Sequence, residues 1–251
     1  MKRYILSMVA LLFLLPVALL SQELNFSYKA TRVLMDSTWD RNNEPVVKGI
    51  IEFYKPEMDR IMQQVIGESE VEMRSSRPES LLSNFAADLL LEYGREKSPS
   101  HVDFSLTNFG GLRAALPKGP VRRYDIFSIF PFENYVVVLD LPGSSVRKLF
   151  DSFARNRVEA FSHNVQLEIR SGALKDVLID GQQIDDSKTY RIVTIDFLMS
   201  GGDNLLALKD ATTVEQTGAL LRDAVIESIE ALTAKKKKIT SAITKRVKFE
   251  E

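Results

Sequence analysis

Short strand patterns separated by irregularly placed helix patterns run through most of the chain, and this order limits the possible folds. Apolar alternation or β-branched runs predict strands at 69–73, 102–106, 135–141, 165–169, 177–179, 190–195 and 247–249. The pair Asp180-Gly181 predicts a hairpin turn after the strand that ends at Ile179. A regular strand–helix–strand repeat is typical of parallel sheets, and the order of elements here has no such repeat. We therefore predict an α+β fold, a single domain in which a mixed sheet is flanked by helices.

Helices are predicted where apolar residues recur every three or four positions. This pattern occurs at 47–65, 81–93, 146–153 and 217–232. The spacing in the first of these segments predicts an amphipathic helix with one buried stripe. Pro78 and Glu79 precede the second segment and suit the first turn of a helix. Ser145 precedes the third segment, where its hydroxyl is expected to cap the helix.

The first residues have the layout of a signal peptide, because Lys2 and Arg3 precede an apolar run that ends at Ser21. A membrane anchor is the competing interpretation, but the run is short for a spanning helix and contains Pro16. We expect cleavage, no membrane contact afterwards, and export to the periplasm or the extracellular space. The predicted divisions are a signal peptide at 1–21, a polar N-terminal segment at 22–45 and one domain at 46–251.

Charge and cysteine content exclude several classes of protein. The 33 basic and 34 acidic residues leave a net charge of -1 and are mostly interspersed, so we expect no nucleic-acid partner. The basic run from Lys235 to Lys238 is interpreted as a solvated helix end. The chain has no cysteine, which excludes disulfides, a thiolate nucleophile and cysteine-bound zinc.

The first candidate binding segment is Thr107-Asn108-Phe109-Gly110-Gly111-Leu112-Arg113, directly after the predicted strand at 102–106. Its two glycines let the backbone turn tightly and approach a ligand. Asn108 offers an amide, and Arg113 offers a forked cation. An ordinary strand-to-loop turn with a solvated arginine has the same residues, so this segment alone leaves the choice open.

The second candidate segment, 129–134, places Phe130 and Phe132 on either side of a proline just before a predicted strand. We expect one of these rings to enter the core and the other to stay outside it. Two core phenylalanines are the simpler alternative.

In the third candidate segment, 195–204, a predicted strand runs into Gly201-Gly202, and Asp203 follows. An aspartate in a turn often hydrogen-bonds only to its own backbone. The functional alternative is that Asp203 accepts both hydroxyls of a ribose, beside an aromatic face that binds the base.

Taken together and in this order, the three segments resemble the 5'-nucleotidase C-terminal domain family. Its hallmarks are an Asn-x-Gly-Gly-x-Arg turn, a Pro-Phe segment before a strand, and a Phe-Leu-x-x-Gly-Gly-Asp segment, and all three occur here. The resemblance extends from about Glu68 to Phe249 and includes Asn84-Phe85-Ala86-Ala87-Asp88, which is similar to the family's Asn-Leu-x-x-Asp type of segment. It implies the family's α+β domain and a nucleotide or nucleoside phosphate as ligand.

The resemblance also implies a role for each site residue. Phe132 and Phe197 would sandwich the base, Asn108 would contact it, and Asp203 would take ribose hydroxyls. Arg113 would lie on the ribose-phosphate side. The implied substrate-binding residues are Asn108, Gly110, Gly111, Arg113, Phe132, Phe197, Gly202, Asp203 and Arg77.

The assignment of Arg77 competes with Arg74. The family has an arginine shortly before the segment that resembles Asn84 to Asp88, and both residues precede that segment here. Pro78 changes the spacing, so either arginine can fill the position.

In the family, a separate N-terminal metallophosphatase domain with two divalent metal ions performs the hydrolysis. This chain has only two histidines, His101 and His163, and neither lies in a Gly-Asn-His or Asp-x-His segment. We expect no catalytic residue and no metal ligand in this chain, and a divalent metal pair on a separate exported metallophosphatase chain. 5'-Nucleotidase activity, in nucleotide catabolism or nucleoside and phosphate scavenging, would then need both chains. The alternative is a stand-alone exported nucleotide-binding module without a catalytic role.

Overall fold

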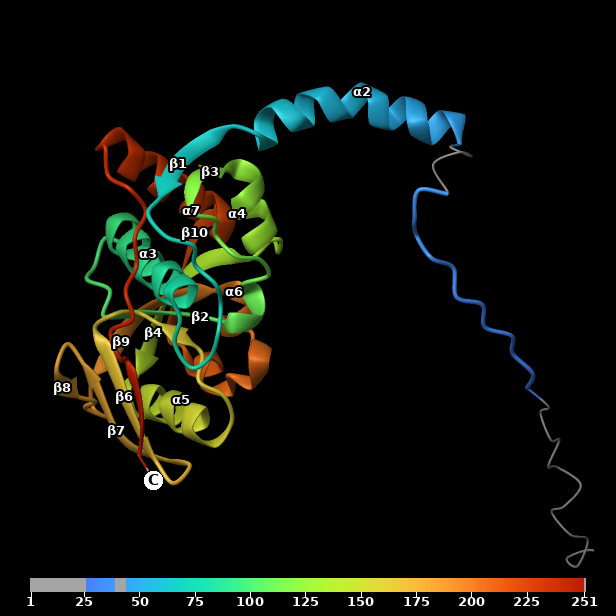
Figure 1. The fold of residues 1–251 in the computed structure, drawn as a ribbon. Coiled ribbons are helices and arrows are strands. Elements are labelled where there is room, and N and C mark those ends of the chain that lie inside the picture. The colour runs from blue at the N-terminus through green and yellow to red at the C-terminus, as the bar shows by residue number, and fades with distance from the viewer. Residues whose placement is uncertain (1–25, 39–43, 251) are drawn as a thin grey trace, which may run out of the picture. The chain divides into compact units, whose positions relative to one another are not determined.

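The computed structural model describes residues 26–38 and 44–250 (Figure 1). The chain divides into two compact units, Met1–Ile51 and Glu52–Glu251. The predicted signal peptide lies outside the described residues. Within the described ranges, no helix combines the length and the apolar character needed to cross a membrane.

Helix α2, Pro45–Met62, forms where the apolar spacing predicted a helix, but its apolar stripe is not buried. No residue of α2 is buried. The prediction of a buried stripe is therefore wrong for the chain on its own. Periodicity shows that one face of a helix is apolar, and it does not show which surface covers that face.

The main sheet has five strands in the order β10-β4-β9-β2-β5. Strand β9 lies at its centre, antiparallel to β4 and parallel to β2, so the sheet is mixed. Helix α3, Leu81–Lys97, packs against β2, and Ser80 caps it by accepting from the backbone N–H of Ser83. The strands are β10 Thr213–Leu220, β4 Tyr135–Pro142, β9 Thr189–Ile195, β2 Phe104–Thr107 and β5 Ala160–Phe161.

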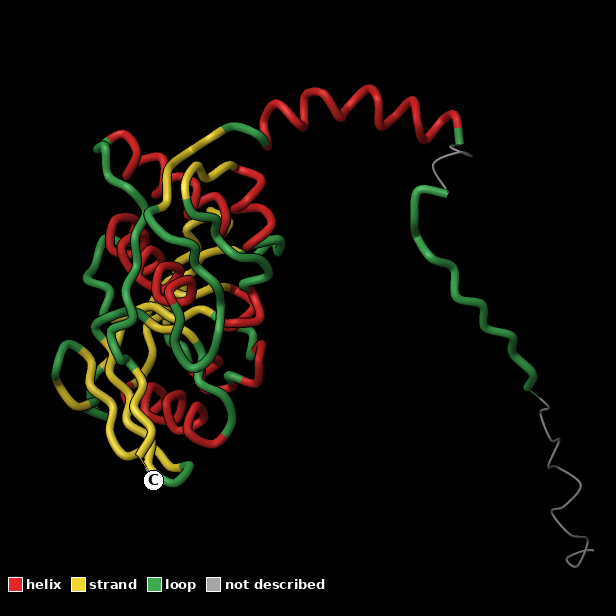
Figure 2. Tube along the Cα trace, viewed as in Figure 1, coloured by secondary structure: helices red, strands yellow, loops and turns green. Residues whose placement is uncertain are grey.

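Two smaller sheets complete the fold, and helices flank the sheets (Figure 2). One pairs β1, Val65–Ser69, with β3, Gly119–Arg122, in antiparallel register. The other has the order β11-β6-β7-β8, in which β11 from the end of the chain runs parallel to β6 (Figure 1). Its strands are β11 Val247–Glu250, β6 Val165–Arg170, β7 Ala173–Ile179 and β8 Gln182–Gln183. The predicted α+β fold is confirmed, with its strands distributed over three sheets.

Several predicted boundaries are corrected by long-range contacts. The late helix, α7 Leu221–Ala234, starts after Thr217, because residues 213–220 instead pair with β4. Ser145 lies inside α5, Gly143–Arg155, and donates to Asp210 Oδ2 at 2.7 Å instead of capping the helix. The strand predicted at 69–73 lies at 65–69. Elements that were not predicted include β3, β5, β10 and α4, Arg123–Ile129.

The core is continuous between the main sheet and its helices. Phe150 of α5 packs edge-on against Phe153 and Phe161, with ring centroids 5.5 and 5.9 Å away, and lies 5.7 Å from Phe104 of β2. All four rings are at most 3% exposed. This packing fixes the position of the carboxyl end of β2. The first candidate binding segment starts at this end.

An ion pair across the main sheet makes part of the stability depend on pH. Arg191 of β9 donates to Asp140 of β4 at 2.8 Å and to Glu215 of β10 at 2.8 Å. The hydrogen bond from Arg191 lowers the pKa of Asp140 below its ordinary value. A carboxyl group with a depressed folded pKa stabilises the fold above its unfolded pKa, near about 4, and loses that contribution as pH falls through the folded value.

We therefore expect Asp140→Asn to be less stable than the wild type at pH 7, with the difference shrinking as pH falls below about 4. Urea unfolding of both proteins at pH 7, 5 and 3 measures the difference in free energy of unfolding. A difference that stays constant over this range would show that the ionised Asp140 does not stabilise the sheet.

Candidate functional site

The first candidate segment forms a tight turn at the end of β2. Residues Phe109–Gly111 make a single 3-10 turn, and the backbone N–H of Gly111 donates to the carbonyl of Asn108 at 3.2 Å. A Cβ at Gly111 would stand 2.7 Å from Asn108 Oδ1, so any side chain there would displace Asn108. The glycine at this position is therefore required by the packing of the turn itself.

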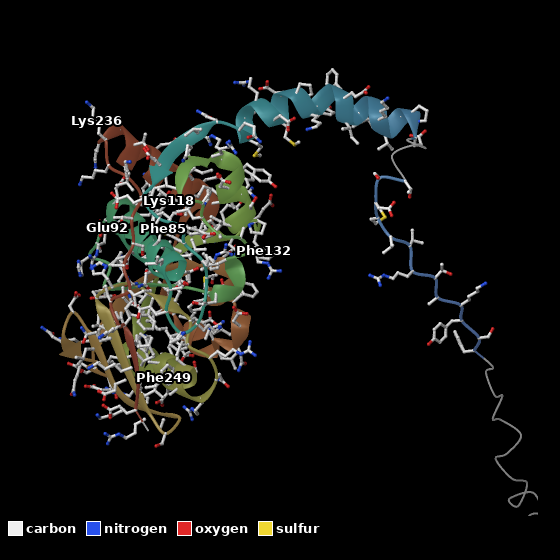
Figure 3. All side chains as sticks on the ribbon, viewed as in Figure 1. Phe85, Glu92, Lys118, Phe132, Lys236 and Phe249 are labelled. Carbon is white, nitrogen blue, oxygen red and sulfur yellow. The ribbon has the colours of Figure 1, made fainter. Side chains whose placement is uncertain are left out.

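One ring of the second segment is buried and the other is exposed, as predicted. Phe130 follows α4 and is 3% exposed, whereas Phe132 is 47% exposed. Figure 3 shows Phe132 at the surface of the domain. One ring is thus a core residue, and the other is available to a ligand.

In the third segment, the strand β9 leads into the short helix α6, Asp196–Met199, and then into a left-handed turn. Gly201 has φ 86° and Asp203 has φ 51°, both in the left-handed region. Phe197 is 44% exposed. A Cβ at Gly202 would stand 2.5 Å from the Phe197 ring and 2.6 Å from its carbonyl oxygen, so Gly202 lets the turn fold closely against Phe197.

The three segments converge on one cavity of about 300 Å³. Seven of the nine residues expected to bind substrate line it, and Asn134 joins them. Gly202 lies directly behind the ring of Phe197, and Arg77 lies in a neighbouring cavity. The lining residues are Asn108, Gly110, Gly111, Arg113, Phe132, Asn134, Phe197 and Asp203.

Asn108 and Asp203 meet in this cavity although 95 positions separate them. Asn108 Nδ2 donates to Asp203 Oδ2 at 2.6 Å. Asn108 is only 4% exposed, and its Oδ1 has no hydrogen-bond partner among the described residues. The amide therefore holds one carboxylate oxygen of Asp203, while Asp203 itself is exposed at the cavity wall.

A second cavity of about 420 Å³ shares Gly110 and Asp203 with the first. Arg77 and Arg157 both line it. The guanidinium of Arg77 lies 4.5 Å from the centroid of the Phe109 ring. The structure thus brings Arg77 beside the predicted site, whereas Arg74 pairs with Glu72 at 2.6 Å and lines neither cavity.

Glu159 is a residue of this site that the sequence did not predict. Its side chain is 5% exposed, and its two oxygens accept from Arg77 at 2.7 Å and from the backbone N–H of Phe109 at 2.7 Å. Burial raises the pKa of Glu159 above its ordinary value, against the opposing effect of the hydrogen bond from Arg77. Nothing in the sequence pairs residue 159 with residues 77 and 109, because only the fold brings β5 beside these loops.

The two histidines lie apart from these cavities. His163 Nδ1 stands 3.2 Å from Asp88 Oδ1, and the other oxygen of Asp88 accepts from Arg246 at 2.6 Å. His101 is exposed in the loop before β2. Within residues 26–38 and 44–250, no three histidine or carboxylate side chains gather in a way that could hold a metal ion.

We expect Gly202→Ala to lower the free energy of unfolding by about 1 kcal/mol, the lower end of the cost of overpacking, because one methyl group is added. The new Cβ would collide with a backbone oxygen, which cannot rotate away, so the turn must shift and carry Phe197 with it. Urea unfolding of the wild type and the variant measures this difference. An unchanged free energy of unfolding would show that the turn accommodates a methyl group at this position.

A family model and several known proteins match this chain, and they agree on one family. Residues 65–210 match a family model described as the 5'-nucleotidase C-terminal domain. The trifunctional nucleotide phosphoesterase YfkN of Bacillus subtilis is 24% identical over 208 residues, which are 75% of this chain and 14% of that protein. The protein UshA of Yersinia enterocolitica is 29% identical over 148 residues, which are 57% of this chain and 26% of that protein. The chain therefore spans about a quarter or less of these two relatives.

Solved structures show the same fold. The 5'-nucleotidase precursor of Thermus thermophilus superposes with a TM-score of 0.70 at 24% identity, over 81% of this chain and 42% of that one. The NAD nucleotidase of Haemophilus influenzae superposes with a TM-score of 0.62 at 19% identity, over 83% of this chain and 42% of that one. Because the family model covers more than half of the chain and three hallmark segments line one cavity, this protein belongs to the 5'-nucleotidase C-terminal domain family.

Proposed function

We propose that this protein is the nucleotide-binding part of an exported 5'-nucleotidase whose hydrolysis is performed by a separate metallophosphatase chain. The observation that carries the proposal is the convergence of the three hallmark segments on one cavity of about 300 Å³. This volume lies at the small end of the range of about 300–1,000 Å³ that is usual for ligand pockets. A nucleoside monophosphate is a ligand of matching size and chemistry.

The base is proposed to stack between Phe132 and Phe197. Both rings line the cavity and are close to half exposed, so they offer free aromatic faces. Stacking of a base on an aromatic ring is tolerant of base identity, which suits a scavenging role.

Asp203 is proposed to accept the ribose hydroxyls. Asn108 holds Asp203 Oδ2 and is itself almost fully buried, so we assign Asn108 to positioning this carboxylate rather than to reading the base. Gly110 and Gly111 complete the wall beside it.

The phosphate is proposed to lie on the side of Arg113 and Arg77. Arg113 is exposed, has no ion-pair partner among the described residues, and lies 5.9 Å from the centroid of the Phe132 ring. Arg77 is paired with Glu159 at 2.7 Å, and this contact fixes its position beside Gly110. A planar, pre-positioned guanidinium binds a phosphate with two parallel hydrogen bonds.

The metal chemistry is assigned to the partner chain. Two divalent ions there would activate water and neutralise the phosphate, while this chain binds and orients the nucleotide. The family resemblance supports this division, and the two relatives named above extend well beyond the part that this chain matches.

We expect the purified protein to release no phosphate from AMP or UDP-glucose with added manganese or zinc. Activity is expected after it is mixed with the exported metallophosphatase chain, and AMP binding by the protein alone is expected in calorimetry. Hydrolysis by the isolated, contaminant-free chain would contradict the split enzyme. AMP binding without activity in any mixture would favour the stand-alone binding module.

A further inference from the structure

Helix α2 carries more exposed apolar side chains than any other helix or strand of the described residues. Their exposed fractions run from 41% for Ile61 to 76% for Phe53. The exposed apolar residues of α2 are Val46, Val47, Ile50, Ile51, Phe53, Tyr54, Met58 and Ile61. Since an isolated helix of this length is marginal in water, this surface calls for a covering partner.

Six of these residues form a continuous stripe, called here the α2 stripe. At 3.6 residues per turn they fall within an arc of about 100°. The α2 stripe consists of Val47, Ile50, Ile51, Tyr54, Met58 and Ile61. On the helical wheel, Gly49 falls on the side opposite the stripe, and Lys55 and Asp59, which pair at 2.6 Å, fall to one side of it. The helix therefore has one apolar face suited to packing and one polar face suited to solvent.

We infer that the α2 stripe is the docking surface for the separate metallophosphatase chain, an inference that rests on the proposed function. Helix α2 ends at Met62, and the match to the C-terminal domain family begins at Val65. The matching family model describes a C-terminal domain, so in a one-chain member the phosphatase part would precede this domain. Helix α2 thus occupies the position at which the phosphatase part of a one-chain enzyme would be joined covalently.

The connection from α2 to the domain suits this role. Only Gln63 and Gln64 separate the end of α2 from β1, and two residues span at most about 7 Å. Strand β1 is paired with β3 and buries Ile66. A phosphatase bound on the last turns of α2 is therefore kept close to the domain, which raises its effective concentration near the bound nucleotide.

The charges of α2 argue against a membrane as the occupant. Between residues 48 and 60 the helix carries three basic and three acidic side chains: Lys48, Lys55 and Arg60 against Glu52, Glu57 and Asp59. Interfacial membrane helices are instead rich in lysine and arginine on the polar face. Mixed charges around an apolar stripe are typical of a helix that packs on another protein.

The test compares two single substitutions that add the same charge to opposite sides of α2. Met58→Glu places a carboxylate in the middle of the α2 stripe, and Gly49→Glu places one on the opposite side, where a side chain meets no atom within 4 Å. The partner in this test is a metallophosphatase chain that the same cell exports and that does not itself contain this C-terminal domain. Calorimetry measures its binding to the wild type and to both variants, and phosphate release from AMP measures the activity of each mixture.

We expect Met58→Glu to weaken the association at least tenfold and to lower the activity of the mixture, while Gly49→Glu behaves as the wild type. AMP binding by either variant alone should be unchanged, because neither residue lines the nucleotide cavity. Equal binding of the phosphatase to the wild type and Met58→Glu would overturn the α2 inference and leave the proposed function standing. Absence of AMP binding by the wild type would overturn the proposed function instead.

Three further results would overturn the inference. A wild-type dimer in ultracentrifugation that Met58→Glu dissociates would assign the stripe to a second copy of this chain. Sedimentation of the wild type with phosphatidylglycerol vesicles, lost in Met58→Glu, would assign it to a lipid surface. A genome that encodes exported metallophosphatases only in chains that already contain this domain, or none at all, would remove the partner inferred here for the stripe.

Discussion

Replacing Phe197 by alanine is expected to weaken AMP binding by roughly 1–3 kcal/mol, and Phe132→Ala should have an effect of similar size. Each ring would lose its stacking contact with the base. Because the two rings are 44% and 47% exposed, their truncation removes less buried surface than truncation of a core ring and should lower the melting temperature less than Phe130→Ala does. Calorimetric titration with AMP and thermal melting of the same variants measure both quantities.

Phe130→Ala provides the matched control for this experiment. Phe130 lies two residues from Phe132 but is 3% exposed, so its truncation leaves a cavity and should cost roughly 3–5 kcal/mol of fold stability. The molecules that remain folded should bind AMP with nearly the wild-type affinity. If Phe132→Ala and Phe197→Ala instead lower the melting temperature strongly and leave the affinity unchanged, both rings belong to the core and the proposed base site is wrong.

Asp203→Asn is expected to weaken the binding of a ribonucleotide by roughly 1.5–3 kcal/mol, because one charge-assisted hydrogen bond to the ribose is lost. The substitution keeps the size of the side chain. Asp203 has φ 51°, a left-handed conformation that asparagine adopts readily, so the turn should be preserved. The new amide can still meet Asn108, which donates to Asp203 Oδ2 in the wild type.

The 2'-deoxy analogue distinguishes a ribose contact from a general electrostatic effect. It lacks one hydroxyl, so it should bind the wild type more weakly than the ribonucleotide and should lose less affinity in Asp203→Asn. Calorimetry with AMP and dAMP on the wild type and on Asp203→Asn gives the four dissociation constants required. Equal losses for the two nucleotides, or no loss for either, would show that Asp203 does not read the sugar.

Local patterns in the sequence predicted most of the strands, and the family resemblance pointed to the candidate site. Strand β4 and strand β9 follow from β-branched runs, because such runs fit a buried pleated surface. The order of the three hallmark segments was enough to identify the family.

Boundaries set by distant partners could not be predicted from local patterns. Residues 217–220 have a helical apolar spacing, yet they belong to β10, which pairs with β4. Ser145 has the residue type expected of a helix cap, but its hydroxyl donates to Asp210, which lies 65 residues away at the end of the 3-10 helix Leu206–Asp210. A capping preference of about 1 kcal/mol is small enough for one such contact to override it.

Only the tertiary structure decided how the site is built. It placed Asn108 against Asp203, buried Glu159 between Arg77 and Phe109, and favoured Arg77 over Arg74 by bringing Arg77 to the cavity beside the site. It also left the stripe of α2 uncovered, although the sequence predicted a buried face. The sequence determines which side chains are available and which local conformations they favour. Contacts between residues far apart in the chain depend on packing, which no local preference encodes.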